Sequence, residues 1–247
     1  MKLNDDIELI DGLPVIFIRS LNAIAVADLH LGYEGVMAKR GMFLPKVNLR
    51  KIVDVLAKSL NKTQAKTIIV DGDIKNEFSR VDEEEFNELL DFIKFTKGSG
   101  VSLILIKGNH DNFVDRYRDP FSLKIYGNEA KMGRYIFFHG DELPGVVPED
   151  VDMLVMGHEH PAIGIFNRAG KKEKLRCFLY GEYEGKKLLV LPAMNYFASG
   201  SDINIIEKKD LLSPIFKYVN VDEMQAIPVG YGSTINFGKI RALRVAL

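Results

Sequence analysis

The chain contains five histidines, and each of them follows a run of apolar residues. The sequence contexts are AIAVADLHLG, LILIKGNHDN, YIFFHGDE and DMLVMGHEHP, which contain His30, His110, His139, His158 and His160. Asp28, Asn109 and Asp111 lie beside these histidines, and Asp73 ends a further apolar run, TIIVDGD. Imidazole, carboxylate and amide oxygen without thiolate form a set of donors that suits Mn, Fe, Zn or Ni.

The apolar runs are expected to be β-strands, and ligand sites in open α/β sheets form just beyond the carboxyl ends of strands. A lone histidine is more often a surface or core residue than a metal ligand. Five histidines scattered at random, however, would rarely all fall at strand ends beside Gly, Asp or Asn. We therefore interpret the histidines and their acidic neighbours as one metal-binding site.

The candidate ligands exceed what one ion needs. The candidates are Asp28, His30, Asp73, Asn109, His139, His158 and His160. A catalytic zinc ion typically takes about three protein ligands, so two ions that share a carboxylate would use the whole set. Two ions about 3.5–4 Å apart are a common arrangement for in-line displacement at phosphorus. On a strand, the two histidines of GHEHP would point to the same side, which suits one ion or two.

Strands and helices alternate in the first half of the chain. PVIFI, NAIAVAD, KTIIVDGD and VSLILIKGNHD are expected to be strands. The segments 44–62 and 81–100 are expected to be helices, because the first has Pro45 near its start and one apolar face, and the second has early acids and late lysines. The run Glu83, Glu84 and Glu85 is interpreted as a solvated helix face. The alternation predicts parallel βαβ units that are buried on both sides.

After residue 120 the pattern changes to short apolar runs separated by turn residues. These runs predict a second, antiparallel or mixed set of strands. We expect a single α/β domain over residues 1–247, and the segment from about residue 200 has too little periodicity to be assigned an element.

The overall composition is that of an ordinary globular protein, with 47% apolar and 27% charged residues. Lys and Arg number 33 against 34 Asp and Glu, so no general electrostatic attraction to nucleic acid is expected, although a local basic patch stays open. The one cysteine, Cys177, excludes a disulfide framework and is expected in the core. Two acids precede the first apolar run, which argues against a signal peptide, and we expect a cytoplasmic protein without a membrane partner.

Five short motifs together resemble the successive sequence blocks of the calcineurin-like metallophosphoesterases. The motifs are DLH, GDIKN, GNHD, HGD and GHEHP, and they follow the family's order between residues 28 and 161. The longer phrases ADLHLGYE and GDIKNEF resemble an archaeal branch related to SbcD-type nucleases and ligase-associated phosphoesterases. The resemblance implies two facing mixed β-sheets flanked by helices.

The resemblance also implies a role for each matching residue. Asp28, His30 and His160 would bind a first metal ion, Asn109, His139 and His158 a second, and Asp73 would bridge the two. His110 would stand near the leaving-group oxygen rather than bind metal, and Asp111 would orient it. The chain departs from many members at Asp141, where they have a second histidine.

These roles predict a dinuclear hydrolase of phosphoesters, in which a metal-bound hydroxide attacks phosphorus in line and His110 assists the leaving group. We expect Mn as the metal, with Fe, Zn or Ni as alternatives, and a phosphodiester of a nucleic acid or nucleotide as the substrate. A phosphomonoesterase, a nucleotide pyrophosphohydrolase and a protein phosphatase remain alternatives on the same site, as does a non-catalytic metal-binding scaffold.

Against a nuclease, the sequence has no strong basic run and no series of aromatic residues of the kind that single-strand binders use. The lysines in 171–174 and 208–209 are interpreted as solvated turns. A dimer is common in the family, but the sequence does not indicate an oligomeric state.

Overall fold

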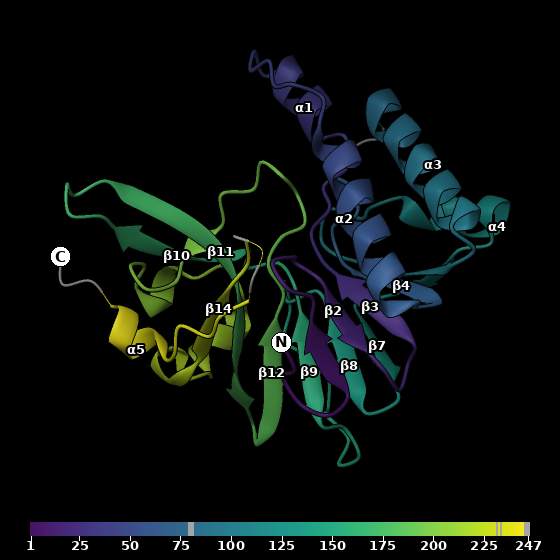
Figure 1. Cartoon of the computed structure of the whole chain (residues 1–247). Coiled ribbons are helices and arrows are strands. Elements are labelled where there is room, and N and C mark those ends of the chain that lie inside the picture. Colours follow the sequence, from purple (N-terminus) through teal and green to yellow (C-terminus); the bar gives the residue numbers. More distant parts are fainter. Residues whose placement is uncertain (79–81, 231, 233, 245–247) are drawn as a thin grey trace.

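A computed structural model describes residues 1–78, 82–230, 232 and 234–244. Two β-sheets face each other, and helices cover the outer side of the first sheet (Figure 1). This arrangement confirms the predicted fold class of two facing mixed sheets flanked by helices.

The first sheet contains the strands of the N-terminal half. Within the described residues it has the order β1 (Ile7–Leu9), β2 (Ile16–Ile18), β3 (Ala23–Val26), β4 (Thr67–Asp71), β5 (Ser102–Ile106) and β6 (Lys124–Tyr126). β1, β2 and β3 pair antiparallel, whereas β3, β4, β5 and β6 pair parallel. The predicted βαβ units are confirmed, because helices lie between consecutive parallel strands in the chain.

The helices follow the expected apolar faces. They are α1 (Tyr33–Lys39), α2 (Asn48–Thr63), α3 (Glu83–Gly98) and α4 (Arg118–Phe121), with a 3-10 turn at Val114–Tyr117. Helix α2 begins three residues after Pro45, and Glu34 Oε1 accepts from the amides of Val47 and Asn48 at its start. Among the described residues, no helix combines the length and the apolar character that a bilayer crossing requires.

The acidic start of α3 is only partly solvated. Asp82 caps the helix by accepting from the amides of Glu84 and Glu85, and Glu84 pairs with Lys46 at 2.8 Å. Glu85, however, is buried and forms an ion pair with the buried Lys75 at 2.8 Å. The interpretation of this run as a solvated face is therefore wrong for Glu85, because Lys75 and the main-chain amides of Asn76 and Glu77 contact its carboxylate.

The second sheet contains the strands after residue 128. Within the described residues its order is β13 (Ser201–Asp202), β10 (Pro161–Phe166), β11 (Lys172–Tyr183), β12 (Lys186–Val190), β9 (Met153–Met156), β8 (Tyr135–Phe138) and β7 (Glu129–Met132), and β14 (Gln225–Pro228) pairs with β11. β8, β9 and β12 pair parallel and the β10–β11–β12 neighbours pair antiparallel, so the predicted mixed sheet is confirmed.

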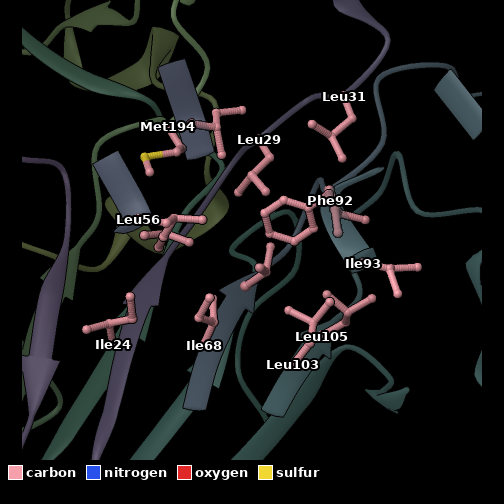
Figure 2. Packing of buried hydrophobic residues seen from close by; sticks show 14 of the residues in the cluster. Ile24, Leu29, Leu31, Leu56, Ile68, Phe92, Ile93, Leu103, Leu105 and Met194 are labelled. Carbon is pink, nitrogen blue, oxygen red and sulfur yellow. The ribbon is translucent and has the colours of Figure 1, made fainter. Parts of the chain in front are cut away.

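Apolar side chains form three layers of core. The first lies between the helices and the first sheet, where Phe92 packs among residues such as Leu105 (Figure 2). The second lies between the two sheets, and the third lies outside the second sheet. Cys177 is fully buried in the third layer, as expected of a core residue.

The third layer is closed by the segment that the sequence pattern left unassigned. It contains 3-10 turns at Lys208–Asp210, Pro214–Lys217 and Val221–Glu223, strand β14, and helix α5 (Ile240–Leu243). Ile215, Phe216 and Ile240 bury their side chains there. Such short elements carry too few turns to show a period in the sequence.

We predict that Phe92→Ala lowers the free energy of unfolding by about 3–5 kcal/mol, because it leaves a cavity between α3 and the first sheet. The measurement is urea unfolding followed by circular dichroism. Phe43→Ala is the matched control, since Phe43 is 87% exposed and its loss should change stability by less than about 0.5 kcal/mol. Equal losses in both variants would contradict the assigned core.

Candidate metal centre

The loops that follow five strands meet at one end of the two sheets. Asp28 and His30 follow β3, Asp73 follows β4, and Asn109 and His110 follow β5 in the first sheet. In the second sheet the loop after β8 contains His139, and the loop after β9 contains His158 and His160. The structure therefore brings the predicted residues together from both sheets.

Three overlapping groups of side chains lie close enough to hold cations. They are Asp28 with His30 and His160, Asp73 with His139 and His158, and His30 with Asp73 and His110. In each group the candidate ligand atoms lie within 4.8 Å of one another. The first two groups match the two ligand sets implied by the family resemblance, apart from Asn109.

The first group is centred on His160. Its Nε2 lies 3.4 Å from Asp28 Oδ1 and 3.3 Å from the Nε2 of His30. The Nε2 of His30 is in turn 3.9 Å from Asp73 Oδ2. Two imidazole nitrogens that face each other at this distance need a proton or a cation between them, so the arrangement fits a metal ion.

The second group is centred on His139. Its Nε2 lies 3.2 Å from Asp73 Oδ2 and 3.2 Å from the Nδ1 of His158. Its Nδ1 lies 3.4 Å from the carbonyl oxygen of Asp71, to which it donates, and this contact turns Nε2 toward the other candidate ligands. Asn109 Oδ1 is buried without a hydrogen-bond partner among the described residues. An orphaned amide oxygen in the loop after β5 also fits a cation.

The backbone at five of these residues is left-handed. The φ angles are 57° at Asp28, 45° at His30, 49° at Asp73, 65° at His158 and 49° at His160. Residues other than glycine adopt this region at a cost of roughly 1–3 kcal/mol each, and such strain is concentrated at functional sites. β9 ends at Met156, so His158 and His160 lie in the loop just beyond the carboxyl end of the strand, where the histidines were expected. The strand geometry considered for the GHEHP motif therefore does not apply to them.

Main-chain hydrogen bonds between the loops hold these conformations. The amide of His30 donates to the carbonyl of Asp73 at 2.9 Å, and the amide of Asp28 donates to Gly72 at 3.1 Å. The amide of His158 donates to the carboxylate of Asp28 at 3.2 Å, and that of His110 donates to Asp73 Oδ1 at 2.9 Å. Two of the predicted ligands, Asp28 and Asp73, thus also shape the neighbouring loops.

Glycine is required at two positions because the side chains of other residues approach the backbone too closely there. A Cβ atom at Gly72 would lie 1.9 Å from the Nδ1 of His139, and one at Gly108 would lie 2.3 Å from Asp73 Oδ1. The glycines of the GDIKN and GNHD motifs therefore leave room for the candidate ligands themselves.

The pKa shifts in the centre come from burial and from close contacts between imidazoles and carboxylates. Burial alone would lower the pKa of His139, but its hydrogen bond to Asp73 raises that pKa to about 10. Burial would also raise the pKa of Asp73, but the contact with His139 outweighs it and holds that pKa well below the usual range. Burial lowers the pKa of His30 to about 4. Since metal ligands must be deprotonated, metal binding would displace the proton from His139.

His110 is held differently from the candidate ligands. Its Nδ1 lies 2.6 Å from the carbonyl oxygen of Asn76, to which it donates, and this contact leaves Nε2 for a substrate. Asp111 was expected to orient this ring, but its carboxylate accepts from the amides of Lys75 and Gly108 at 3.2 and 2.9 Å. Asp111 therefore supports the backbone of the two loops.

The ion pair between Lys75 and Glu85 fixes the loop that carries the Asn76 carbonyl. Glu85 Oε2 accepts from the amides of Asn76 and Glu77 at 2.9 and 2.6 Å. The ammonium group of Lys75 donates to the carbonyl of Glu77 at 2.9 Å. Because Lys75 is buried in this pair, it holds the loop and does not face the open site.

Two buried asparagines that the sequence pattern did not indicate support the first group. Asn48 Nδ2 donates to the carbonyls of Leu29 and His30 at 3.1 and 3.3 Å, and its Oδ1 accepts from the amide of Tyr196. The main-chain amide of Asn195 donates to the carbonyl of Asp28 at 3.0 Å, and its side-chain Nδ2 donates to the carbonyl of Leu29 at 3.5 Å. No local motif marks such residues, because their partners are backbone atoms far away in the sequence.

Residues 21–149 match the family described as calcineurin-like phosphoesterase. Among solved structures, the chain is similar to nuclease MPE of Pseudomonas putida, with 17% identity, a TM-score of 0.64, and coverage of 93% of this chain and 100% of that one. This likeness indicates a shared fold. YfcE, a phosphoesterase from E. coli, has 15% identity with this chain, over 72% of this chain and 83% of YfcE. The TM-score of 0.43 is too low to show a common fold. No curated protein matches the chain.

We predict that Mn²⁺ stabilises the metal-free protein, by about 2.7 kcal/mol at a concentration 100 times its Kd. Asp73→Asn should lose most of this gain, because it removes the central charge while keeping an acceptor for the His110 amide. The measurement is thermal unfolding after dialysis against EDTA, with and without MnCl2.

Glu159→Gln is the control for this prediction. Glu159 lies between two candidate ligands in the sequence, but its Oε2 accepts from the amide of Ser213 at 2.9 Å, so this variant should keep the full gain. An equal loss in both variants would show that the gain does not come from the assigned cluster.

Proposed function

We propose that this chain, which belongs to the calcineurin-like phosphoesterase family and is a metal-dependent phosphoesterase, hydrolyses phosphodiesters of nucleic acids with two divalent ions. The observation that carries the proposal is the pair of ligand groups joined through Asp73, whose Oδ2 lies 3.2 Å from His139 Nε2 and 3.9 Å from His30 Nε2. One carboxylate that faces imidazoles of both groups supports a bridging role.

The ligand assignment follows from the two groups. Asp28, His30 and His160 would hold the first ion, Asn109, His139 and His158 the second, and Asp73 both. Carboxylate, amide oxygen and imidazole without thiolate suit Mn²⁺, with Fe, Zn or Ni as alternatives. When bound, two such ions would supply a nucleophilic water near neutral pH and would neutralise charge on the phosphoryl oxygens.

His110 is proposed to protonate the leaving oxygen. It lies beside the first group, with its ring centroid 5.1 Å from that of His30. The carbonyl of Asn76 accepts from its Nδ1, so the proton that passes to the leaving oxygen would be the one on Nε2 of the imidazolium form, and the ring would be left neutral. A positioned general acid of this kind contributes about 10²–10⁴ in rate.

A phosphodiester is preferred over a monoester because the similar solved structure is called a nuclease. A non-catalytic scaffold is disfavoured, since every residue of the implied ligand set is present and lies at the same end of the two sheets. The same two ions could also support hydrolysis of phosphomonoesters or nucleotide pyrophosphates. A comparison of substrates therefore has to distinguish a phosphodiesterase from these two alternatives.

We predict that the protein hydrolyses bis(p-nitrophenyl) phosphate faster than p-nitrophenyl phosphate, and only with added Mn²⁺. His110→Ala should lower kcat by about 10²–10⁴-fold and keep two ions per chain, because His110 acts on the leaving group. The measurements are steady-state kinetics and metal content by mass spectrometry.

Two results would contradict these assignments. A fall in metal content of His110→Ala would make His110 a ligand, and absence of diester hydrolysis with two ions bound would exclude the proposed reaction. Glu159→Gln, which keeps the ligands, is the matched control for nonspecific damage to the site.

A further inference from the structure

A cavity of about 390 Å³ adjoins the metal centre. Its lining includes His30 and His160 of the first ligand group, together with Tyr33, Asn195 and Phe197. This volume is in the range of small-molecule sites, which run from roughly 300 to 1,000 Å³. A group attached to a phosphate at the metal centre could therefore enter the cavity.

Two aromatic rings form one wall of this cavity. Tyr33 and Phe197 stack with their centroids 5.8 Å apart and their planes inclined by 13°. Tyr196, which is 50% exposed, packs edge-on against Phe197 at 5.2 Å. We call Tyr33 and Phe197 the aromatic pair; its members come from the start of α1 and from the loop after β12, far apart in the sequence.

The segment that carries Phe197 is held rigidly. Asn195 Oδ1 accepts from the amides of Phe197 and Ala198 at 2.7 and 3.1 Å. Arg176 donates to the carbonyls of Ala193 and Asn195, both at 3.0 Å. A wall that is ordered before binding loses little conformational freedom when a ligand arrives.

The charges around the cavity restrict its occupant. None of the described residues that line it is Lys or Arg, and its one carboxyl group belongs to the buried Glu159. A second phosphate would find no basic side chain there. Aromatic faces with the hydroxyls of Ser199 and Ser201 suit instead a neutral, flat and polar-edged group, which describes a nucleobase.

We propose that the aromatic pair binds the base of a nucleotide adjacent to the scissile phosphate. The proposal rests on the proposed phosphodiesterase function and narrows its substrate to nucleic-acid strands whose base is free to leave its own stack. A base against an aromatic ring is a sequence-tolerant contact, because every base has a π-face. The subsite therefore favours nucleotides over simple phosphate diesters without selecting one base.

The kinetic test compares two single-stranded DNA decamers with the Mn²⁺-loaded protein. One decamer carries bases throughout, and the other has the same backbone with abasic sugars. We expect KM to be about tenfold lower for the decamer with bases, and Phe197→Leu to reduce this ratio to about one, because leucine keeps apolar volume but has no π-face. Phe197→Tyr should restore the preference, and Phe43→Ala, an exposed aromatic elsewhere, should leave it unchanged.

A binding measurement separates the subsite from the reaction. Titration calorimetry with Mn²⁺ present should show adenosine 5′-monophosphate binding about tenfold more tightly than ribose 5-phosphate to the wild type, and equally tightly to Phe197→Leu. Tyr33→Leu is the second variant if Phe197→Leu does not fold, as judged by thermal unfolding.

The outcomes distinguish the two proposals. Loss of diester hydrolysis together with retained discrimination for the adenine base would overturn the proposed function and support the subsite. Equal KM values for both decamers in the wild type, or an undiminished preference in a folded Phe197→Leu variant, would overturn the subsite and leave the aromatic pair as a packing contact of the loop.

Discussion

The contact between Asp73 and His139 joins the two sheets at the point on which the metal centre depends. Asp73 follows β4 of the first sheet and His139 follows β8 of the second, and their side chains meet at 3.2 Å while both are buried. Removing one partner of a buried charge pair typically costs about 3–5 kcal/mol, because the other charge is left uncompensated. Gly72 belongs to the same constraint, since any side chain there would occupy the place of the His139 ring.

This contact requires a backbone that ordinary strands and turns do not supply. Asp28, His30, Asp73, His158 and His160 all adopt left-handed conformations, and the parallel strands before them provide fixed ends from which the loops start. Hydrogen bonds between loops and the ion pair of Lys75 with Glu85 offset the strain. The supporting residues are therefore as necessary to the geometry as the candidate ligands, although they carry no chemistry themselves.

One buried side chain connects the metal centre with the aromatic pair. Asn48 donates to the carbonyls of Leu29 and His30, and its oxygen accepts from the amide of Tyr196. Asn48, at the start of α2, therefore holds both the loop of the first ligand group and the segment that contains Phe197. Glu34, which accepts from the amides at that helix start, extends the support to α1. The position of the aromatic wall relative to the candidate ligands is thus set by the fold.

The sequence alone determined the parallel strands, the helices between them and the position of the histidines at strand ends. Apolar periodicity and the glycines that follow apolar runs are local signals, so they can be recognised without the tertiary structure. It also determined the candidate ligands, since His, Asp and Asn stand directly after apolar runs. Tertiary structure decided what depends on the path of the chain: the burial of Glu85 against Lys75, the left-handed loop at His158 and His160, and the support given by Asn48. It likewise decided that Asn76 rather than Asp111 orients His110, and it paired Tyr33 with Phe197. These contacts join residues distant in sequence, and their energies exist only once the two sheets face each other.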